Sequence, residues 1–341
     1  MPQYLPWVSV EMERLLAGDT RALARAISEI EDRQPGTGEL IQQISARRGG
    51  GIQTHIVGLT GPPGSGKSTL ADGLTQLWRA LGRRVAVLAV DPNSRLTGGA
   101  ILGDRVRMQR HALDQGVFIR SMGARGHLGG VSLATRGAAR LLEALGWEMV
   151  LVETVGVGQS ELEICEIADS VVVVATPAAG DGVQVIKAGI TEIADLFAVN
   201  KADLDGADLV VGELRDLVRS RREEGVWQVP VIPTVATGGA EGVQPLAAAL
   251  DRHLAQLAAT GELAERAARR VRDEVVELVG AAAADFARLA LRETGGELWS
   301  GDPGSANPEQ MARAILRRLV AEQRAGPGAA LVPDVNARGW E

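Results

Sequence analysis

The sequence predicts an α/β fold with a doubly wound, mostly parallel sheet, preceded by a helical segment and followed by a helical arm. Short aliphatic runs alternate with segments of helical spacing between residues 50 and 258. This alternation is typical of a parallel sheet that is covered by helices on both faces. The runs VAVLAV and VVVVA contain no polar residue, as expected for strands that are buried on both sides. Outside residues 50–258 the spacing is helical alone, apart from the last residues.

The elements are expected in the following order. Residues 1–49 place apolar side chains three and four positions apart, which predicts a helical segment. Strands are expected at residues 55–60, 85–90, 148–153, 170–176, 195–200 and 229–234. Residues 259–325 are expected to be helical, because Asn307 and Pro308 give the start signal of a last helix. The tail, 326–341, is rich in Pro and Gly and is expected to be loose.

The composition narrows the class of protein. Hydrophobic residues make up 45% and charged residues 23%, which excludes a disordered chain. The net charge of −7 provides no basic field, so neither nucleic acid nor a membrane surface is an expected partner. The single cysteine, Cys165, excludes an internal disulfide and fits the reducing cytoplasm. We expect no secretory signal and no membrane span, because no apolar run approaches the roughly 20 residues that a span needs.

A phosphate-binding motif follows the first expected strand. Residues 61–69, GPPGSGKST, match GxxxxGK[ST] between a strand and a helical stretch, which is the context that the motif requires. Glycines allow backbone amides to surround a phosphate, Lys67 can reach the β- and γ-phosphates, and the Ser68 hydroxyl can bind Mg²⁺. The residues of this loop are Gly61, Pro62, Pro63, Gly64, Ser65, Gly66, Lys67, Ser68 and Thr69.

A guanine-recognition motif follows a later strand. Asn200, Lys201 and Asp203 match NKxD after the run DLFAVN. The Asp203 carboxylate can accept hydrogen bonds from guanine N1 and the exocyclic amine, whereas adenine offers no donor at either position. The predicted nucleotide is therefore GTP or GDP. After the next strand, Val235, Ala236 and Thr237 occupy the place of a loop that contacts guanine O6, although they depart from the usual Ser-Ala-Lys.

Carboxylates at two other strand ends are candidate magnesium and catalytic residues. Glu153 and Gly156 resemble DxxG with Glu in place of Asp, so Glu153 can hold the water shell of Mg²⁺ and Gly156 can contact the γ-phosphate. Asp91 ends the second strand, and Asp104 lies in the following glycine-rich stretch, so either can be a magnesium ligand. The alternative for Glu153 is a solvated strand end. Residues 92–102 are a candidate switch loop.

Lysine is rare in this chain, and one lysine lies outside these motifs. Of the 36 basic residues three are lysines, at 67, 187 and 201. Lys187 follows the fourth expected strand, on the side of the sheet that carries the phosphate loop. Asp181 and Lys187 could form alternative ion pairs in two nucleotide states, which would make this a third switch region. The alternative is an exposed lysine that contributes almost nothing.

Other chemistries have weaker support. The four histidines, His55, His111, His127 and His253, show no spacing typical of a metal site. Cys165 lies in the apolar pattern ELEICEIA, which favours a packed side chain over a nucleophile.

Five blocks together resemble one family. They are GPPGSGKST, VDPNSRLTGGAILGDRVRM, RGHLGGVS, ETVGVGQSE and NKAD, in order along residues 61–203. They are similar to the MeaB/ArgK group of SIMIBI-class P-loop GTPases, and the resemblance extends over nearly the whole chain. It implies a homodimeric GTPase, with dimerisation through the C-terminal helical arm. It also implies a chaperone that protects an adenosylcobalamin-dependent methylmalonyl-CoA mutase and gates its cofactor loading, but not that this chain binds cobalamin.

Two alternatives stay open. A related GTPase could deliver nickel to a metalloenzyme, although one cysteine and scattered histidines count against it. A phosphotransfer kinase linked to amino-acid transport is the other, although NKAD favours a GTP-dependent switch. Intrinsic hydrolysis is expected to be slow, because Val157 and not Gln follows Gly156.

Overall fold

The computed structural model describes residues 6–49, 52–90, 109–111, 113–123, 130–154, 163–177, 192–220, 227–293 and 307–324. The chain divides into two compact units, Met1–Val271 and Arg272–Glu341. The first unit contains the sheet and the candidate site.

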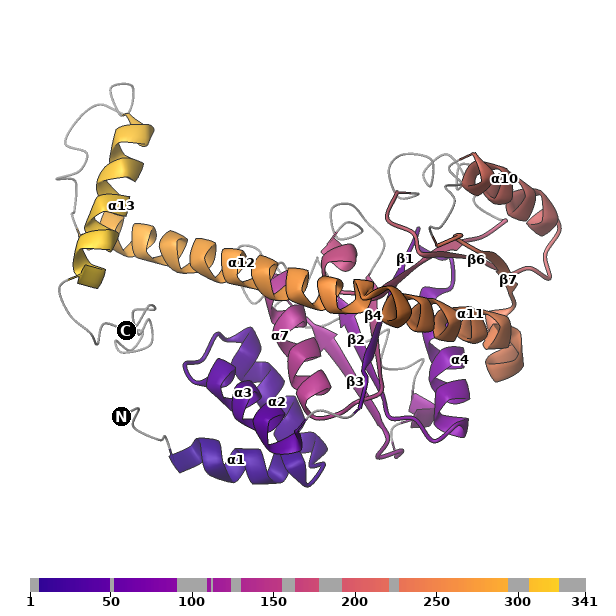
Figure 1. Ribbon diagram of the computed structural model, residues 1–341, viewed down its shortest axis with the longest axis horizontal. Helices are drawn as coiled ribbons and strands as arrows, with labels where there is room; N and C mark the ends of the chain where they lie inside the picture. Colours follow the sequence, from indigo (N-terminus) through magenta and orange to yellow (C-terminus); the bar gives the residue numbers. More distant parts are fainter. Residues whose placement is uncertain are drawn as a thin grey trace. The chain divides into compact units, whose positions relative to one another are not determined.

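The centre of the first unit is a seven-stranded sheet in which every pairing is parallel (Figure 1). The strand order is β3-β2-β4-β1-β5-β6-β7. The strands are β1 (His55–Thr60), β2 (Val85–Val90), β3 (Val117–Met122), β4 (Met149–Thr154), β5 (Ser170–Ala175), β6 (Leu196–Asn200) and β7 (Val231–Thr234). The parallel α/β sheet predicted from the sequence is confirmed.

Strand β3 was not among the expected strands. It pairs with β2 at the edge of the sheet, and its middle residues are only half-buried. Its sequence, VFIRSM, carries Arg120 and Ser121 and so lacks the continuous aliphatic run of a central strand. An edge strand that is partly polar cannot be distinguished from a loop by that criterion.

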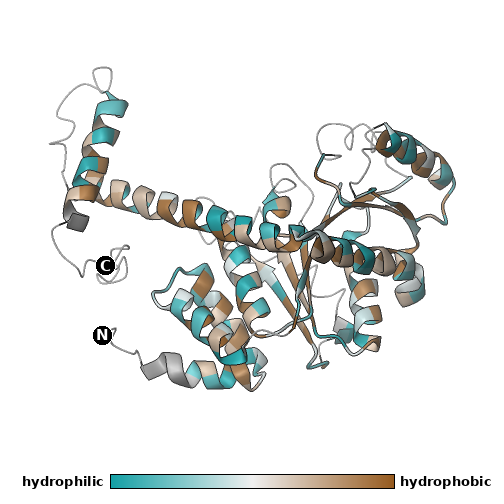
Figure 2. Ribbon diagram, in the orientation of Figure 1, coloured by the Kyte–Doolittle hydropathy of each residue, from teal (hydrophilic) through white to brown (hydrophobic). Residues whose placement is uncertain are grey.

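Helices cover both faces of the sheet. One face packs against α4 (Lys67–Ala80) and α11 (Gly239–Thr260). The other packs against α7 (Gly130–Ala144), α10 (Ala207–Arg219) and three N-terminal helices, α1 (Pro6–Leu16), α2 (Thr20–Glu31) and α3 (Thr37–Arg48). Figure 2 shows hydrophobic strands and helices that carry both hydrophilic and hydrophobic residues.

Successive strand residues enter two different hydrophobic cores. In β1, Ile56 belongs to one core and Val57 to the other, and in β5 Val173 and Val174 divide in the same way. All residues of both strands are buried. Successive side chains of a strand point to opposite faces, and helices cover both faces of this sheet. The sheet is therefore fixed from both sides, which gives its loops a rigid base.

The N-terminal helices are part of the first unit. Helices α2 and α3 pack on α7, where Gly137 leaves room for Ile30: a Cβ at Gly137 would lie 2.6 Å from Ile30 Cγ2. Arg120 of β3 donates to Glu31 Oε2 at 2.5 Å and to Ser28 Oγ at 3.0 Å. Helix α2 is therefore attached to β3 at the edge of the sheet.

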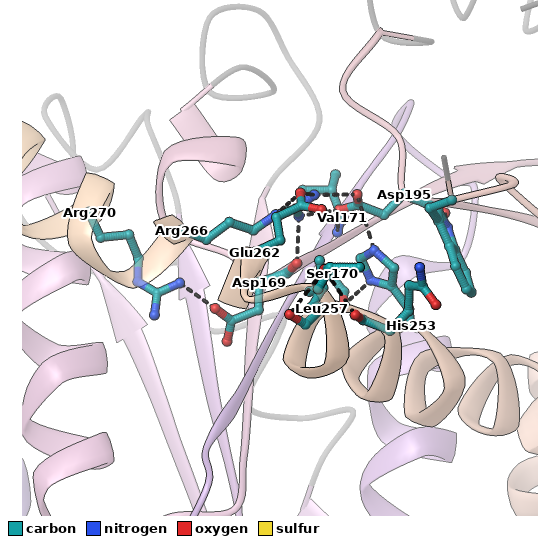
Figure 3. Close-up of polar contacts among 12 residues, drawn as sticks. Asp169, Ser170, Val171, Asp195, His253, Leu257, Glu262, Arg266 and Arg270 are labelled. Atoms are coloured by element: carbon teal, nitrogen blue, oxygen red, sulfur yellow. Dashed lines mark hydrogen bonds and ion pairs between the residues drawn. The ribbon is translucent and has the colours of Figure 1, made fainter. Parts of the chain in front are cut away.

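Two arginines attach the start of α12 (Glu262–Glu293) to the sheet (Figure 3). Arg266 donates to both carboxylate oxygens of Asp195 at 2.9 and 3.0 Å and to the Asp169 carbonyl at 2.6 Å. Arg270, one turn later, pairs with the Asp169 carboxylate. Asp169 and Asp195 directly precede β5 and β6. Together with Arg266 and Arg270 they form what we call the α12 clamp, which joins α12 to the N-terminal ends of these two strands.

Two buried histidines lie beside the clamp. His55 Nε2 and His253 Nδ1 each lie 2.7 Å from the Ser170 hydroxyl, and His253 Nε2 is 3.5 Å from Asp195 Oδ1. A proton on His253 Nε2 faces that carboxylate most favourably, so Nδ1 accepts from Ser170 and Ser170 accepts from His55. Burial lowers the pKa of both histidines, that of His55 to about 3.

The second unit contains the rest of α12 and α13 (Pro308–Arg324), whose start is capped by Asn307. On α12, Val275, Leu278 and Val279 are spaced three and four residues apart and are 53%, 46% and 60% exposed. They therefore form one uncovered apolar face of the helix. Within the described residues, neither α12 nor any other helix is apolar enough over sufficient length to cross a membrane.

The buried histidines predict a loss of stability in acid. Unfolding returns the pKa of His55 from about 3 to its usual 6.5, so the unfolded chain binds a proton that the folded chain excludes. The free energy of unfolding should fall as the pH drops from 6.5 toward 3, and His55 alone accounts for about 2 kcal/mol between pH 7 and pH 5. Urea unfolding, followed by the fluorescence of buried Trp78 and Trp147, measures this loss.

His55→Gln should reduce this loss by about 2 kcal/mol, because glutamine does not titrate. Val57→Ala, two positions later in β1, is the matched control and should lower the free energy of unfolding equally at both pH values. An unchanged pH dependence in His55→Gln would contradict the assignment of a neutral, buried His55.

Candidate functional site

The predicted nucleotide motifs lie at one edge of the sheet. In a parallel sheet all strands end at the same edge, which is where ligands bind in open α/β folds. The loop 61–66 follows β1, Glu153 lies next to the last residue of β4, Asn200 ends β6 and Val235 follows β7. Strands β4, β1, β5, β6 and β7 are neighbours in that order, so segments that are far apart in the sequence meet at one site.

The loop 61–66 has the backbone that its glycines predict. Gly61 and Gly66 have φ values of +138° and +90°, which side chains rarely allow. A Cβ at Gly61 would lie 2.3 Å from the Val174 carbonyl oxygen, and one at Gly66 would lie 2.2 Å from Asn200 Nδ2. Both positions therefore need glycine for conformation and for space. The loop leads directly into α4, whose N-terminus carries no side-chain cap.

Lys67 extends back over this loop. Its ammonium donates to the carbonyls of Gly61 and Pro62 at 2.8 and 3.0 Å, and the residue is 6% exposed. The positive charge is thus held at the N-terminus of α4, where the helix dipole adds positive potential. This arrangement suits the phosphates of a nucleotide.

Ser68 and Glu153 meet beside the phosphate loop. The Ser68 hydroxyl donates to Glu153 Oε1 at 2.5 Å, and Glu153 is 5% exposed. A hydroxyl and a carboxylate oxygen are the donors that Mg²⁺ prefers, so this pair fits a magnesium ion that also keeps waters and phosphate oxygens. The other predicted residues of this group, Asp91, Asp104 and Gly156, lie outside the described residues.

Asn200 connects three segments of the site. Its Nδ2 donates to the Ser65 carbonyl at 2.8 Å, and its Oδ1 accepts from the Ala236 amide at 3.1 Å. The Thr234 hydroxyl is 3.4 Å from the same oxygen, and Asn200 is 2% exposed. One buried amide therefore fixes the phosphate loop against the two loops that are expected to bind the base.

The residues after Asn200 form a turn at the same edge. Lys201 adopts a left-handed backbone with φ of +60°, which is uncommon outside glycine, and its ammonium donates to the Gly64 carbonyl at 3.0 Å. The Ala202 amide donates to the Thr234 carbonyl at 3.0 Å. Asp203 is exposed at this turn, so its carboxylate is accessible to a base.

The loop after β7 begins at the nucleotide edge of the sheet and is held by two hydrogen bonds. Ala236 lies in the turn η4 (Ala236–Gly238) and is fixed by Asn200, whereas Val235 donates its amide to the Gly242 carbonyl at 3.1 Å. Thr237 follows in the same turn. The role of these three residues in contacting guanine O6 stays a prediction.

Residues set aside in the sequence analysis are also described. Burial raises the pKa of the Cys165 thiol to about 11, so the thiol is protonated at neutral pH and packs against the core. His111 Nε2 lies 2.9 Å from Asp72 Oδ1, and His55 and His253 share Ser170. These three histidines are thus held in buried contacts.

Thr234 belongs to the site but was not predicted from the sequence. Its hydroxyl contacts Asn200, and a polar residue at the end of an aliphatic strand could have indicated this position. The proposed switch residues Asp181 and Lys187 lie outside the described residues.

Comparison with known proteins supports the nucleotide motifs. The model of the family described as "Methylmalonyl Co-A mutase-associated GTPase MeaB" matches residues 23–290. The chain is 47% identical over 285 residues to a protein of Pyrococcus horikoshii named as a GTPase, covering 83% of this chain and 89% of that one. It is 37% identical over 270 residues to the mouse protein "Methylmalonic aciduria type A homolog, mitochondrial", covering 74% and 64%.

A solved structure shares the fold. The crystal structure of a protein named "LAO/AO transport system kinase" superposes with a TM-score of 0.61 and 26% sequence identity, covering 92% of this chain and 97% of that one.

The exposed carboxylate of Asp203 predicts a change of base specificity. Asp203→Asn should weaken GDP binding by about 10- to 100-fold, because an amide cannot accept from both guanine N1 and the exocyclic amine. The variant should bind xanthosine diphosphate better than wild type does, because the amide donates to the additional oxygen of that base. Titration calorimetry with both diphosphates measures the two affinities.

Asp205→Asn, two residues later in the same exposed turn, is the matched control and should leave both affinities unchanged. If Asp203→Asn bound GDP as tightly as wild type, Asp203 would have no part in reading the base.

Proposed function

The chain belongs to the MeaB family of methylmalonyl-CoA mutase-associated GTPases, and on this premise we propose that it is a GTP-hydrolysing chaperone of an adenosylcobalamin-dependent methylmalonyl-CoA mutase. In this proposal the chain protects the mutase and uses the GTP and GDP states to control loading of the mutase cofactor. The Asn200 network is the observation that carries the guanine-nucleotide part of the proposal. The family description and the mouse relative support the mutase as client.

The residues of the site have distinct roles in the proposed hydrolysis. Lys67 and the N-terminus of α4 bind the β- and γ-phosphates. Ser68 and Glu153 would hold Mg²⁺, together with Asp91 and Asp104, and Gly156 would contact the γ-phosphate. The bound ion would neutralise charge on the phosphates. Asp203 reads the base.

Of the two alternatives, nickel delivery finds no support among the histidines and the cysteine that the structure describes. Nickel delivery needs exposed histidine or cysteine ligands, whereas His55, His111 and His253 are buried in hydrogen bonds and the Cys165 thiol is protonated. A kinase linked to amino-acid transport finds support in the name of the similar protein of known structure. The two proposals differ in the acceptor of the γ-phosphate, which is water in hydrolysis and a protein in the kinase reaction. A cytoplasmic location belongs to the proposal and rests on the single cysteine.

Hydrolysis with and without a purified methylmalonyl-CoA mutase tests the proposal. We expect slow release of phosphate by the chain alone, because Val157 and not glutamine stands directly after Gly156 to orient water. With the mutase we expect release at least tenfold faster. Chelation of Mg²⁺ should stop both reactions. Label from γ-phosphate on a protein would favour the kinase instead, and an unchanged rate with the mutase would contradict the proposed client.

Lys187 is proposed to act as a switch residue with Asp181. Lys187→Ala should leave GDP affinity and intrinsic hydrolysis within twofold of wild type and reduce the acceleration by the mutase. Arg219→Ala, which removes an exposed charge from α10, is the control and should change none of these quantities. A wild-type acceleration in Lys187→Ala would leave Lys187 as a surface charge.

We also propose that the chain is a homodimer and that the apolar face of α12 contacts a second copy. Val275, Leu278 and Val279 are exposed in the single chain, and burying such side chains contributes about 1.5 to 3 kcal/mol each. Light scattering at micromolar concentration should give twice the 35.8 kDa chain mass. Val275→Glu with Val279→Glu should give the monomer mass. A wild-type monomer would contradict the dimer.

A further inference from the structure

A buried carboxylate lies one helical turn beyond Ser68. Asp72 of α4 is 4% exposed, and its two oxygens have different partners. His111 Nε2 lies 2.9 Å from Oδ1, and Arg110 pairs with Oδ2. The partners are consecutive residues of the short turn η1 (Gln109–His111), so the contact, which we call the Asp72 fork, joins this turn to the phosphate-binding helix.

A second ion pair holds the same segment farther along α4. Arg79 donates through Nε and Nη2 to the two oxygens of Asp114 at 2.9 and 2.8 Å. The Gly116 amide also donates to Asp114 Oδ1 at 2.8 Å. Residues 110–116 are therefore attached to α4 at two places before the chain enters β3.

The two attachments differ in their distance from the phosphates. With a rise of about 1.5 Å per residue, Asp72 lies about 6 Å along α4 from Ser68, and Arg79 lies about 16 Å from it. The fork is thus at the end of α4 that carries Lys67 and Ser68. The Arg79 pair is near the opposite end, where β3 begins.

The fork constrains the chain strongly, because a carboxylate that is removed from water needs partners for both oxygens. Losing either Arg110 or His111 would leave one oxygen of a buried carboxylate without its partner. Helix α4 and residues 110 and 111 are therefore held in one relative position. The His111 side chain, 9% exposed, is enclosed with Asp72.

This position matters for the end of α4 that carries the phosphate-binding residues. Lys67 and Ser68 lie in the first turn of α4, and Asp72 follows in the next turn. The fork therefore attaches the turn next to Ser68 to residues 110 and 111.

We propose that Asp72 is a positioning residue for GTP hydrolysis, which it serves by holding Arg110 and His111 against the phosphate-binding helix. The proposal rests on the function proposed above. Asp72 contacts neither nucleotide nor metal in this account. It fixes the turn of α4 next to Ser68, so its loss should affect magnesium use and the hydrolysis rate more than nucleotide affinity.

Asp72→Asn tests the proposal, with Asp114→Asn as matched control. Both variants remove one carboxylate charge from an attachment of residues 110–116 to α4. For Asp72→Asn we expect single-turnover GTP hydrolysis to be at least tenfold slower, or to need about tenfold more Mg²⁺ for half of the maximal rate. Its affinity for GDP without Mg²⁺ should stay within twofold. Asp114→Asn should be within twofold of wild type in all three quantities.

Two results would overturn the proposal. One is a wild-type rate with wild-type Mg²⁺ dependence in Asp72→Asn. The other is an equal loss in Asp114→Asn, which would make both ion pairs merely structural. If Asp72→Asn does not fold, Arg110→Met replaces it, because the Arg110 side chain is 54% exposed and its removal leaves His111 on Asp72.

The failure of this inference is distinguishable from the failure of the proposed function. If the wild-type chain hydrolyses GTP and Asp72→Asn is equally active, the inference about Asp72 fails and the proposed function stands. A wild-type chain that hydrolyses no GTP removes both.

Discussion

The arrangement of the site depends on the buried amide of Asn200. An amide side chain is both donor and acceptor, and Asn200 uses both functions, toward the Ser65 carbonyl and the Ala236 amide. These partners follow β1 and β7, which lie three strands apart across the sheet. A carboxylate at this position could not donate to Ser65, and an aliphatic side chain would leave two buried backbone groups without partners. The phosphate half and the base half of the site are therefore linked by one residue.

The sheet and the α12 clamp make this link rigid. Two hydrophobic cores hold the strands from both faces, so that the loops at one edge extend from a fixed base. At the other edge Asp169 and Asp195, which precede β5 and β6, bind Arg266 and Arg270 of α12. Helix α12 thus begins as part of the nucleotide-binding unit. Its later residues, which are proposed to contact a second copy, belong to the same helix.

Much of the fold and site could be predicted from the sequence, because the signals are local. Lys67 and Ser68 lie in one short motif, and Asn200 ends an aliphatic run, so their positions at strand ends followed from neighbouring residues. Contacts between distant side chains leave no such signal. The ion pairs of Asp72 and of Arg266 join residues that are far apart in sequence, and an arginine or aspartate in a helical pattern usually indicates a solvated surface. Strand β3 was missed because Arg120 interrupts its apolar run and instead pairs with Glu31 in α2.

The affinity of Asn200→Ala for GDP tests most directly whether this amide holds the two halves of the site together. Titration calorimetry should show binding at least 100-fold weaker than wild type, about 2.7 kcal/mol, although the account requires no contact between Asn200 and the phosphates. Thr234→Val, which removes only the 3.4 Å contact to Asn200 Oδ1, should stay within threefold of wild type. An affinity of Asn200→Ala within threefold of wild type would contradict the account.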